Sequence, residues 1–425
     1  MPSMAVAMDA RDQEMLAGEQ GAATALAMRI VVAMADAAGA ERLIDITGAH
    51  IDSCLYHGRV GLRFAERLAG DGATVRVPTT LNVSALDLLH PERVRLTEPA
   101  RSEARRQMAV YESMGCQPTW TCAPYQLPGR PAFGEHVCWA ESNAIVFANT
   151  VLGARTDRYG DFMDICAAIT GRVPEAGLHL DANRVGTVLF RLRGIGRTAL
   201  DQEAFWALLG HVVGARAGTE VSVIEGSLGD VSEDHLKALA AAAASSGSVA
   251  LIHVVGITPE ALTLADALGG RSPARTMDVG PDDLRAAAAE LTTADIGGAL
   301  RAVSVGTPHL SLAGFERLTP MLAATRIHPD VTFYVSTGRD VLRAAEDRGW
   351  LPVYRAPGIR LVVDTCTYIT PVLAPEETLA MTDSAKWAWY APANLGISAA
   401  FGTLEDCVRS AAAGRVIRDF GWLDR

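Results

Sequence analysis

The segment from residue 119 to 179 concentrates side chains that could carry out chemistry. It holds Cys122, Glu141, Asn143 and Arg155 between short apolar runs. Burying thiol, carboxylate, amide and guanidinium groups costs free energy unless each one is paired, so a packed core has no need of this mixture. A site that binds a charged ligand and moves protons does need it. We therefore take this segment as the first candidate for a catalytic site.

Two cysteines stand in polar loops rather than in apolar stripes. Cys122 follows Trp120-Thr121, and Cys366 follows Val363-Asp364-Thr365. Thiolates from distant loops can converge on one metal or iron–sulfur centre. The alternative, which the spacing alone favours, is two buried, inert thiols. The other five cysteines lie in apolar or helical settings. The sequence contains no Cys-x-x-Cys pair, so neither a zinc knuckle nor a disulfide framework is indicated.

Histidines and a serine–lysine pair supply candidate proton carriers. Several histidines fall at expected strand or loop ends, where one or two could act as acids, bases or ligands. A lysine near a serine hydroxyl could favour an alkoxide-like base, and Ser384 and Lys386 are separated by one residue. The alternative for this pair is a helix N-terminus with a solvated lysine. The histidines in question are His50, His136, His179, His253 and His309.

A glycine pattern offers a weaker alternative function. Residues 194–199, Gly-Ile-Gly-Arg-Thr-Ala, fit a dinucleotide fingerprint, and Glu220 lies near the position of a ribose-binding acid. Two arginines interrupt the segment before the pattern, so we do not favour this interpretation. Gly-x-Ser-x-Gly, Walker A and His-Glu-x-x-His motifs are absent, which leaves simple serine hydrolase, P-loop and zincin functions without support.

Composition sets outer limits on location and partners. The chain has 425 residues and a net charge of −11. No basic run suggests a nucleic-acid partner. Asp9, Arg11, Asp12 and Glu14 make the start of the chain unlike a signal peptide, and no apolar run resembles a membrane span. We expect a cytoplasmic protein with neither nucleic-acid nor membrane partners.

Helices and strands alternate, which predicts α/β layers with mainly parallel sheets and ligands at the carboxyl ends of the strands. Thr258 and Pro259 resemble the start of a helix. A polar loop is expected at 78–82. Lobe boundaries are expected near 190 and 290. Expected helices span 12–38, 60–69, 236–244 and 282–291, and expected strands span 42–47, 73–77, 249–254, 301–305 and 360–363.

Short segments along most of the chain resemble the large, catalytic part of the aconitase X family. They cover roughly residues 12 to 415, with possible lobes at 12–190, 191–290 and 291–415. The matching segments are Gly48-Ala49-His50-Ile51-Asp52, Val77-Pro78-Thr79-Thr80-Leu81-Asn82, Thr121-Cys122-Ala123-Pro124-Tyr125, Trp139-Ala140-Glu141-Ser142-Asn143-Ala144, Gly153-Ala154-Arg155-Thr156, Gly171-Arg172-Val173-Pro174, Gly256-Ile257-Thr258-Pro259-Glu260-Ala261, Pro308-His309-Leu310-Ser311 and Asp364-Thr365-Cys366.

The resemblance implies an aconitase-like, multi-lobed α/β fold and dehydration of a hydroxylated acid at an iron–sulfur centre. Family members dehydrate cis-3-hydroxy-L-proline, and others act on mevalonate 5-phosphate. The family also has a small swivelling domain, which we expect on a separate partner chain because no such segment is found here. A different class of function remains open, namely a non-catalytic metal-binding or subunit-binding scaffold.

One position departs from the family pattern. Members can carry a cysteine ligand in a Gly-Cys-Pro-His segment, where this chain has Gly306-Thr307-Pro308-His309. Cys122 and Cys366 match the family's other cysteine segments and are the expected metal ligands. Thr307 cannot supply a thiolate, so we expect a two-iron cluster in preference to a four-iron one. The alternatives are a mononuclear iron or a third ligand from elsewhere in the chain.

The expected reaction is a β-elimination, in which a base removes the proton α to the carboxylate and the 3-hydroxyl leaves as water. We expect Ser384, supported by Lys386, to be the base, with His50 and Glu141 as the next candidates. Arg155 could hold the substrate carboxylate through its guanidinium fork, although a structural ion pair is an alternative. Further expected substrate-binding residues are Thr80, Asn82, Ser142, Asn143, His179 and His309.

Overall fold

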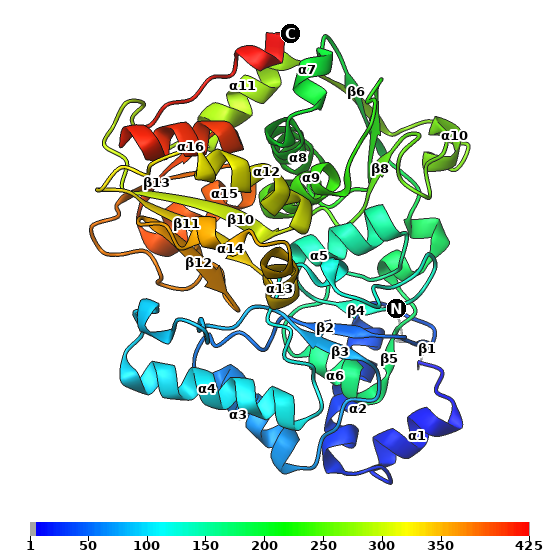
Figure 1. Cartoon of the computed structure of the whole chain (residues 1–425). Helices are drawn as coiled ribbons and strands as arrows, with labels where there is room; N and C mark the ends of the chain where they lie inside the picture. The colour runs from blue at the N-terminus through cyan, green and yellow to red at the C-terminus, as the bar shows by residue number, and fades with distance from the viewer. Residues whose placement is uncertain (1–5, 425) are drawn as a thin grey trace. The chain divides into compact units, whose positions relative to one another are not determined.

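The computed structural model describes residues 6–424, which form two compact units (Figure 1). The first unit contains the described residues up to 86 together with 96–185. The second contains 87–95 and the residues from 186 onward. The chain therefore leaves the first unit, contributes a nine-residue segment to the second, and returns.

Helices of the first unit surround short strands. The strands are β1 (Leu43–Asp45), β2 (Ala49–Ile51), β3 (Thr79–Leu81), β4 (Cys138–Trp139) and β5 (Arg172–Pro174). The helices are α1 (Ala10–Ala17), α2 (Ala22–Ala37), α3 (Arg59–Gly70), α4 (Glu98–Ser113), α5 (Ser142–Phe147) and α6 (Met163–Thr170), and a π-helical turn at Ala148–Leu152 continues α5.

A parallel sheet in the order β3-β2-β4 is the centre of the first unit. Strand β2 is buried along its whole length. The β1–β5 pair is antiparallel and forms a separate ribbon. Because β2, β3 and β4 run in one direction, the residues that follow them gather at one edge.

A parallel four-stranded sheet opens the second unit, in the order β8-β7-β6-β9. Helices α8 and α9 pack closely because Gly210 and Gly214 face α9. A Cβ on Gly210 would lie 2.3 Å from the Leu239 carbonyl oxygen. The elements are β6 (Val188–Leu192), α7 (Arg197–Leu200), α8 (Glu203–Ala217), β7 (Ser222–Glu225), α9 (Glu233–Gly247), β8 (Ile252–Val254), α10 (Leu264–Ala267), β9 (Arg275–Val279) and α11 (Pro281–Glu290).

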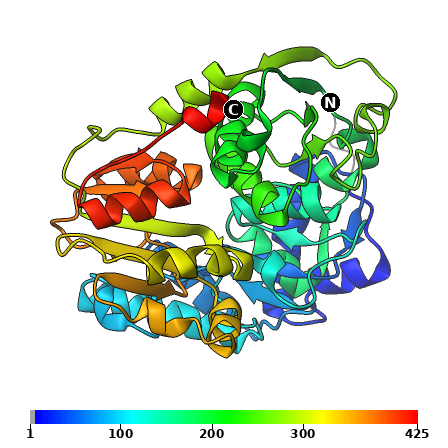
Figure 2. The same ribbon diagram turned by 45° about the horizontal axis from the view of Figure 1, so that its top comes forward.

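A parallel five-stranded sheet follows, in the order β12-β11-β10-β13-β14, with β10 at its centre. Its strands run from yellow to orange-red in Figures 1 and 2. Phe315, Phe333 and Val335 belong to its apolar core. The elements are β10 (Ala302–Leu310), α12 (Leu312–Ala323), β11 (Thr332–Thr337), α13 (Arg339–Asp347), α14 (Leu351–Tyr354), β12 (Ile359–Val363), β13 (Leu379–Thr382), α15 (Ala385–Leu395), β14 (Ser398–Phe401) and α16 (Leu404–Ala413).

The prediction of α/β layers with mainly parallel sheets is confirmed. The helix expected at 12–38 is instead two helices, α1 and α2. The strand expected at 73–77 is wrong, because Val75 N–H donates to the Met114 carbonyl and Arg76 N–H to that of Ala168, both at helix ends. The expected polar loop contains β3. Thr258 begins no helix, since its hydroxyl accepts from Val254 N–H and closes a turn before α10.

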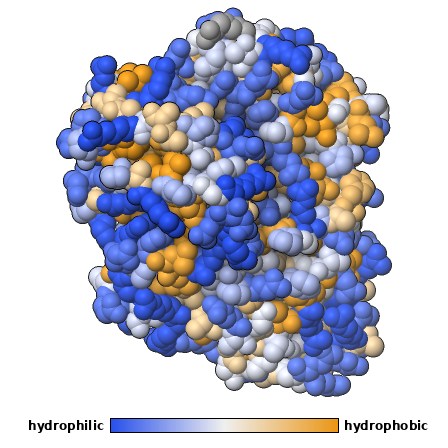
Figure 3. All heavy atoms as spheres, in the orientation of Figure 1, coloured by the Kyte–Doolittle hydropathy of each residue, from blue (hydrophilic) through white to orange (hydrophobic). Residues whose placement is uncertain are grey.

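The surface that faces the viewer in Figure 3 interleaves hydrophilic residues with small apolar groups. Among the described residues, no helix combines the length and the apolar character needed to span a membrane.

Candidate active site

The carboxyl edge of the five-stranded sheet brings together residues from segments far apart in the sequence. His309 lies near the end of β10, Cys366 follows β12, and Ser384 follows β13. All three strands are parallel members of one sheet. This edge is where open α/β sheets bind ligands.

A bend in β10 presents His309. The register of β10 on β11 shifts between Val305 and Leu310. Gly306 has a φ of +87°, and a Cβ there would lie 2.2 Å from the Ser336 carbonyl oxygen. Only glycine satisfies both conditions without strain. The segment after Gly306 is thereby freed from regular pairing with β11.

His309 and Cys366 form a buried imidazole–thiol pair within the second unit. A ring nitrogen of His309 and the Cys366 sulfur lie within 4.8 Å of each other. His309 Nε2 lies 3.2 Å from the Thr365 carbonyl oxygen. Because a carbonyl can only accept, Nε2 is the donor in this contact. The pair thus offers one imidazole and one thiolate donor.

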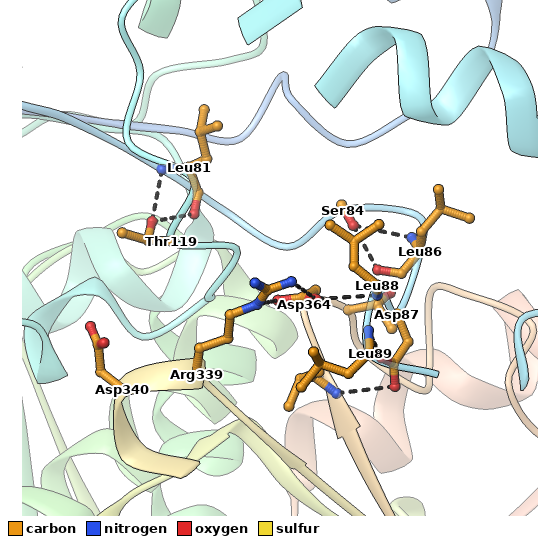
Figure 4. Close-up of polar contacts among 12 residues, drawn as sticks. Leu81, Ser84, Leu86, Asp87, Leu88, Leu89, Thr119, Arg339, Asp340 and Asp364 are labelled. Atoms are coloured by element: carbon orange, nitrogen blue, oxygen red, sulfur yellow. Dashed lines mark hydrogen bonds and ion pairs between the residues drawn. The ribbon is translucent and has the colours of Figure 1, made fainter. Parts of the chain in front are cut away.

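Asp364 fixes the loop that carries Cys366 (Figure 4). Its side chain is fully buried and accepts from Arg339 Nε at 2.6 Å and Nη2 at 2.7 Å. The backbone N–H of Leu88, from the nine-residue segment, donates to the same carboxylate at 3.2 Å. Asp364 has a φ of +63°, a strained conformation for a non-glycine residue. These bonds hold the turn two residues before Cys366.

Ser384 is the N-cap of α15. Its hydroxyl accepts from Trp387 N–H at 3.1 Å and donates to the Thr307 carbonyl oxygen. The side chain therefore links the first turn of the helix to the bent segment of β10. The alternative of a helix N-terminus is correct for Ser384, but the lysine beside it is not solvated. Lys386 is buried, with its ammonium 5.9 Å from the centre of the Tyr368 ring.

A narrow cavity extends from Ser384 and Lys386 toward a cluster of charged residues. Lys237 donates to Asp234 at 2.8 Å, and Arg317 pairs with the same carboxylate at 3.2 Å. Burial opposes the charge on Lys237, but Asp234 and Glu203 outweigh it and raise the lysine's pKa. The cavity is lined by, among others, Glu203, Lys237, Thr307, Asp383, Ser384 and Lys386. Burial and the charge of Glu203 raise the pKa of Asp383 to about 7.

The carboxyl edge of the first unit's parallel sheet carries a second group of polar residues. Asp52 follows β2, Asn82 follows β3, and Glu141 follows β4. The Asn82 amide donates to the Asp52 carboxylate. Burial, followed by the negative charges of Glu141 and Asp161, raises the pKa of Asp52 to about 7. This edge is therefore acidic and partly desolvated.

Glu141, Ser142 and Asn143 organise the start of α5 and the loop of Cys122. Glu141 caps α5 by accepting from Ala144 N–H at 2.8 Å, and the Ser142 hydroxyl donates to it at 3.2 Å. The Asn143 amide donates to the Cys122 carbonyl at 3.0 Å. The Tyr125 hydroxyl donates to the Asn143 oxygen at 2.7 Å. Asn143 thus positions the backbone on which Cys122 sits.

His50 and Thr80 lie within the same sheet, on β2 and β3. His50 Nδ1 lies 2.8 Å from the Thr80 hydroxyl oxygen. His50 is fully buried, and burial lowers its pKa to about 3. The imidazole is consequently neutral at physiological pH.

His179 and Arg155 lie in a different polar network of the first unit. His179 Nδ1 is 2.9 Å from His136 Nδ1, and its Nε2 is 2.6 Å from the Tyr159 hydroxyl. Burial, then the charge of His136, lowers the pKa of His179 to about 3. Arg155 donates to the His179 carbonyl at 3.2 Å and pairs with Asp181. The structural ion pair that the sequence left open is thus present.

The remaining sequence motifs show ordinary structural roles. Burial raises the pKa of Cys54, Cys138 and Cys407 well above the usual value. The glycine pattern after β6 leads only into the four-residue α7, and Glu220 pairs with Arg275. The glycine pattern and Glu220 therefore do not form a nucleotide-binding site.

Several residues of these edges escaped the sequence analysis. Asp52 and Asp364 were visible within the quoted segments but had no assigned role. Arg339 and Lys237 lie on helices and look like surface charges in the sequence. The signal for Asp52 and Asp364 was their place directly after a strand, the same signal that identified Cys366.

Comparison with known proteins matches the chain to the aconitase X domains in order. The first domain matches residues 5–182, the second 186–289 and the third 300–413. The cis-3-hydroxy-L-proline dehydratase of Pseudomonas aeruginosa is 46% identical over 96% of this chain and 70% of that protein.

Two archaeal proteins extend the match. The phosphomevalonate dehydratase large subunit of Methanothermobacter thermautotrophicus is 36% identical over 95% of this chain and 98% of that protein. The crystal structure of Thermococcus kodakaraensis aconitase X in its holo-form superposes with a TM-score of 0.85 at 30% identity, covering 96% of this chain and 100% of that one. The chain therefore belongs to the aconitase X family of dehydratases.

Proposed function

We propose that this chain carries the catalytic centre of a dehydratase that converts cis-3-hydroxy-L-proline to Δ1-pyrroline-2-carboxylate. The 46% identity to a protein named for this substrate carries the proposal. Loss of the α-proton and of the 3-hydroxyl yields one water and an enamine. The enamine then moves one proton from nitrogen to carbon to give the cyclic imine.

Ser384 is the proposed proton acceptor. Its oxygen lies at the N-terminus of the eleven-residue α15, where the helix dipole favours negative charge. Lys386, buried in the first turn, adds a positive charge to the same region. Both effects stabilise an ionised hydroxyl. A backbone carbonyl is too weak a base to take the Ser384 proton, so the proposed acceptor is the Asp383 carboxylate, which lines the same cavity and whose pKa is raised to about 7 by burial.

The donor set fits an iron centre. His309 and Cys366 offer an imidazole and a thiolate, a combination found in iron–sulfur and mononuclear iron sites. Cys122, whose loop Asn143 positions, is the proposed third ligand on the strength of its sequence segment. When bound, iron would supply Lewis-acid assistance to the departing hydroxyl.

The type of centre follows from the same ligands. Thr307 directs its carbonyl to Ser384, and a threonine hydroxyl is a poor iron ligand beside thiolate. Two cysteines and one histidine suit a two-iron cluster or a single iron better than a four-iron cluster held by three cysteines. This assignment moves His309 from substrate binding to the metal centre.

Anaerobic purification and a substrate screen test the proposal. Iron and sulfide analysis should give equal amounts for a two-iron cluster, and the pyrroline product should form from cis-3-hydroxy-L-proline. Turnover of mevalonate 5-phosphate instead would assign the chain the function of its archaeal relatives. Full metal loading without turnover of either compound, with the partner present, would favour a non-catalytic scaffold.

Single substitutions test the ligands. Cys122→Ser, Cys366→Ser and His309→Ala should each lower iron content and bleach the visible absorption. Cys407→Ser is the matched control, because this thiol is fully buried in α16. Unchanged iron content in Cys122→Ser and Cys366→Ser would refute the assignment, as would a clean four-iron resonance in the reduced wild type.

A small partner chain is the last part of the proposal. The Methanothermobacter thermautotrophicus relative is named a large subunit, and the match covers 98% of its length. Closure of a separate domain over a site excludes water and completes the catalytic set. Activity should appear when the chain is mixed with its partner, and full activity of the purified chain alone would contradict this expectation.

A further inference from the structure

The acidic edge of the first unit contains a carboxylate that no step of the proposed chemistry uses. Asp52 follows the central strand β2, so the residues that follow β3 and β4 flank it on either side. Asn82 lies on one side and Glu141 on the other. The backbone N–H groups of Asp52 and Ser53 donate to Asp164 at 2.8 and 2.9 Å, which fixes the turn. The Asp52 side chain therefore has a defined position.

The acidic residues around Asp52 favour the binding of a cation. The neighbouring groups that act on its carboxylate are Glu141, Asp161 and Asp164, all acidic. Like charges in a partly desolvated site repel one another, and a bound cation relieves that repulsion. Asp52 is half-buried and remains accessible to a ligand, whereas Asp164 is fully buried.

Asn82 gives an independent indication that a ligand binds here. Its side chain is 3% exposed and its nitrogen donates to Asp52. Its oxygen has no hydrogen-bond partner within the described residues 6–424. A buried carbonyl oxygen without a donor costs free energy, so a ligand that brings an N–H group is favoured here. Amide oxygens also ligate hard metal ions, so the experiment below includes magnesium and potassium to separate a metal ion from a cation that carries N–H groups.

We infer that Asp52 and Asn82 bind the cyclic secondary ammonium group of an amino-acid substrate. A ring nitrogen of this kind carries one positive charge and two N–H bonds. One N–H can donate to the Asp52 carboxylate and the other to the Asn82 oxygen. This inference rests on the proposed function and adds the group that selects an imino acid over a hydroxy acid without nitrogen. Asp52 and Asn82 bind the substrate and take no proton from its α-carbon.

Competitive inhibition with two ring analogues tests the inference. L-Proline keeps the ammonium group, and tetrahydrofuran-2-carboxylate replaces it with an ether oxygen that has neither charge nor N–H. In the holoenzyme with its partner, Asp52→Asn should lower the affinity for L-proline by about 10- to 100-fold, which is the range for loss of a charge-assisted hydrogen bond. The ether analogue should bind weakly to the wild type and equally weakly to Asp52→Asn. Calorimetric titration with L-proline gives the same comparison without turnover.

Controls separate binding from folding and from catalysis. Asp52→Glu should recover part of the L-proline affinity, and Asn82→Ala should show a smaller loss than Asp52→Asn. Asp71→Asn removes a surface carboxylate of the same unit, paired with Arg67 at 3.0 Å. This variant should change the affinity for neither inhibitor. Magnesium or potassium should not restore the affinity of Asp52→Asn.

Three outcomes would overturn the inference. Unchanged L-proline affinity in Asp52→Asn, with cis-3-hydroxy-L-proline still turned over by the wild type, would refute it while leaving the proposed function intact. If Asp52→Asn lowers kcat and α-hydrogen exchange but leaves the L-proline affinity unchanged, Asp52 is the base instead. A wild type that neither binds L-proline nor turns over cis-3-hydroxy-L-proline would remove the proposed function and this inference together.

Discussion

Replacing Arg339 should destabilise the second unit far more than replacing another arginine of the same helix. Arg339 makes two hydrogen bonds to Asp364, at 2.6 and 2.7 Å, and Asp364 is fully buried. Removing one partner of a buried ion pair leaves an uncompensated charge, which costs about 3–5 kcal/mol. The Arg339 side chain is 36% exposed and Leu88 N–H still solvates the carboxylate, so we expect a value near the lower end, about 3 kcal/mol.

Arg343→Ala is the matched control for Arg339→Ala. Arg343 lies one turn later on α13 and pairs with Asp340 at 2.9 Å, but its side chain is 70% exposed. A pair of this kind contributes about 0–1 kcal/mol. Urea unfolding monitored by circular dichroism gives the free energy of each variant, and a double-mutant cycle with Asp364→Asn isolates the pair.

The same substitution should also loosen the loop of Cys366. Hydrogen bonds from Arg339 and Leu88 N–H to the Asp364 side chain help to hold its backbone at a φ of +63°. We expect Arg339→Ala to lower iron occupancy, while Arg343→Ala keeps the wild-type content. Equal destabilisation by the two variants would refute the reasoning, as would a full iron complement in Arg339→Ala.

Two further predictions concern Ser384 and His179. Ser384→Ala should lower turnover by about a hundredfold or more and suppress exchange of the substrate's α-hydrogen with solvent, with little change in substrate affinity. Ser384→Asn can still cap α15, so it should be as inactive as Ser384→Ala but more stable than that variant by about 1 kcal/mol. Exchange of the α-hydrogen at the wild-type rate in either variant would exclude Ser384 as the base. The pKa of His179 is about 3 when folded, below its ordinary value, so this residue makes stability fall as the pH drops below about 6.5. His179→Gln should reduce the loss of unfolding free energy between about pH 7.5 and 5.5 by about 1.4 kcal/mol, and an identical pH profile would contradict this assignment.

The sequence predicted which strands the candidate site residues follow better than how the fold brings those residues together. Cys366 was singled out by its polar loop and Ser384 by the lysine two residues later, and the structure places both beyond strands of one parallel sheet. His309 was expected to bind substrate, since nothing in its own segment indicates that the bend at Gly306 brings it within 4.8 Å of the Cys366 sulfur. That proximity depends on sheet order, which local spacing does not encode.

Errors in the predicted elements have a similar cause. Residues 73–77 have the composition of a strand, but their N–H groups bond to carbonyls at the ends of α4 and α6. Residues 79–81 look like a polar loop, yet they pair with β2 in a parallel register. In both places a tertiary partner decided between two conformations that the local sequence permits.

Helix caps explain why site residues and structural residues coincide in this chain. Glu141 caps α5 just after β4, and Ser384 caps α15 just after β13. In a parallel α/β layer, each helix begins where a strand has ended, so capping side chains gather at the ligand-binding edge. A cap already fixes the side-chain oxygen and places it in the positive field of the helix terminus. Catalytic use of Ser384 therefore requires no additional positioning device, and its capping role and its proposed role as a base draw on the same field.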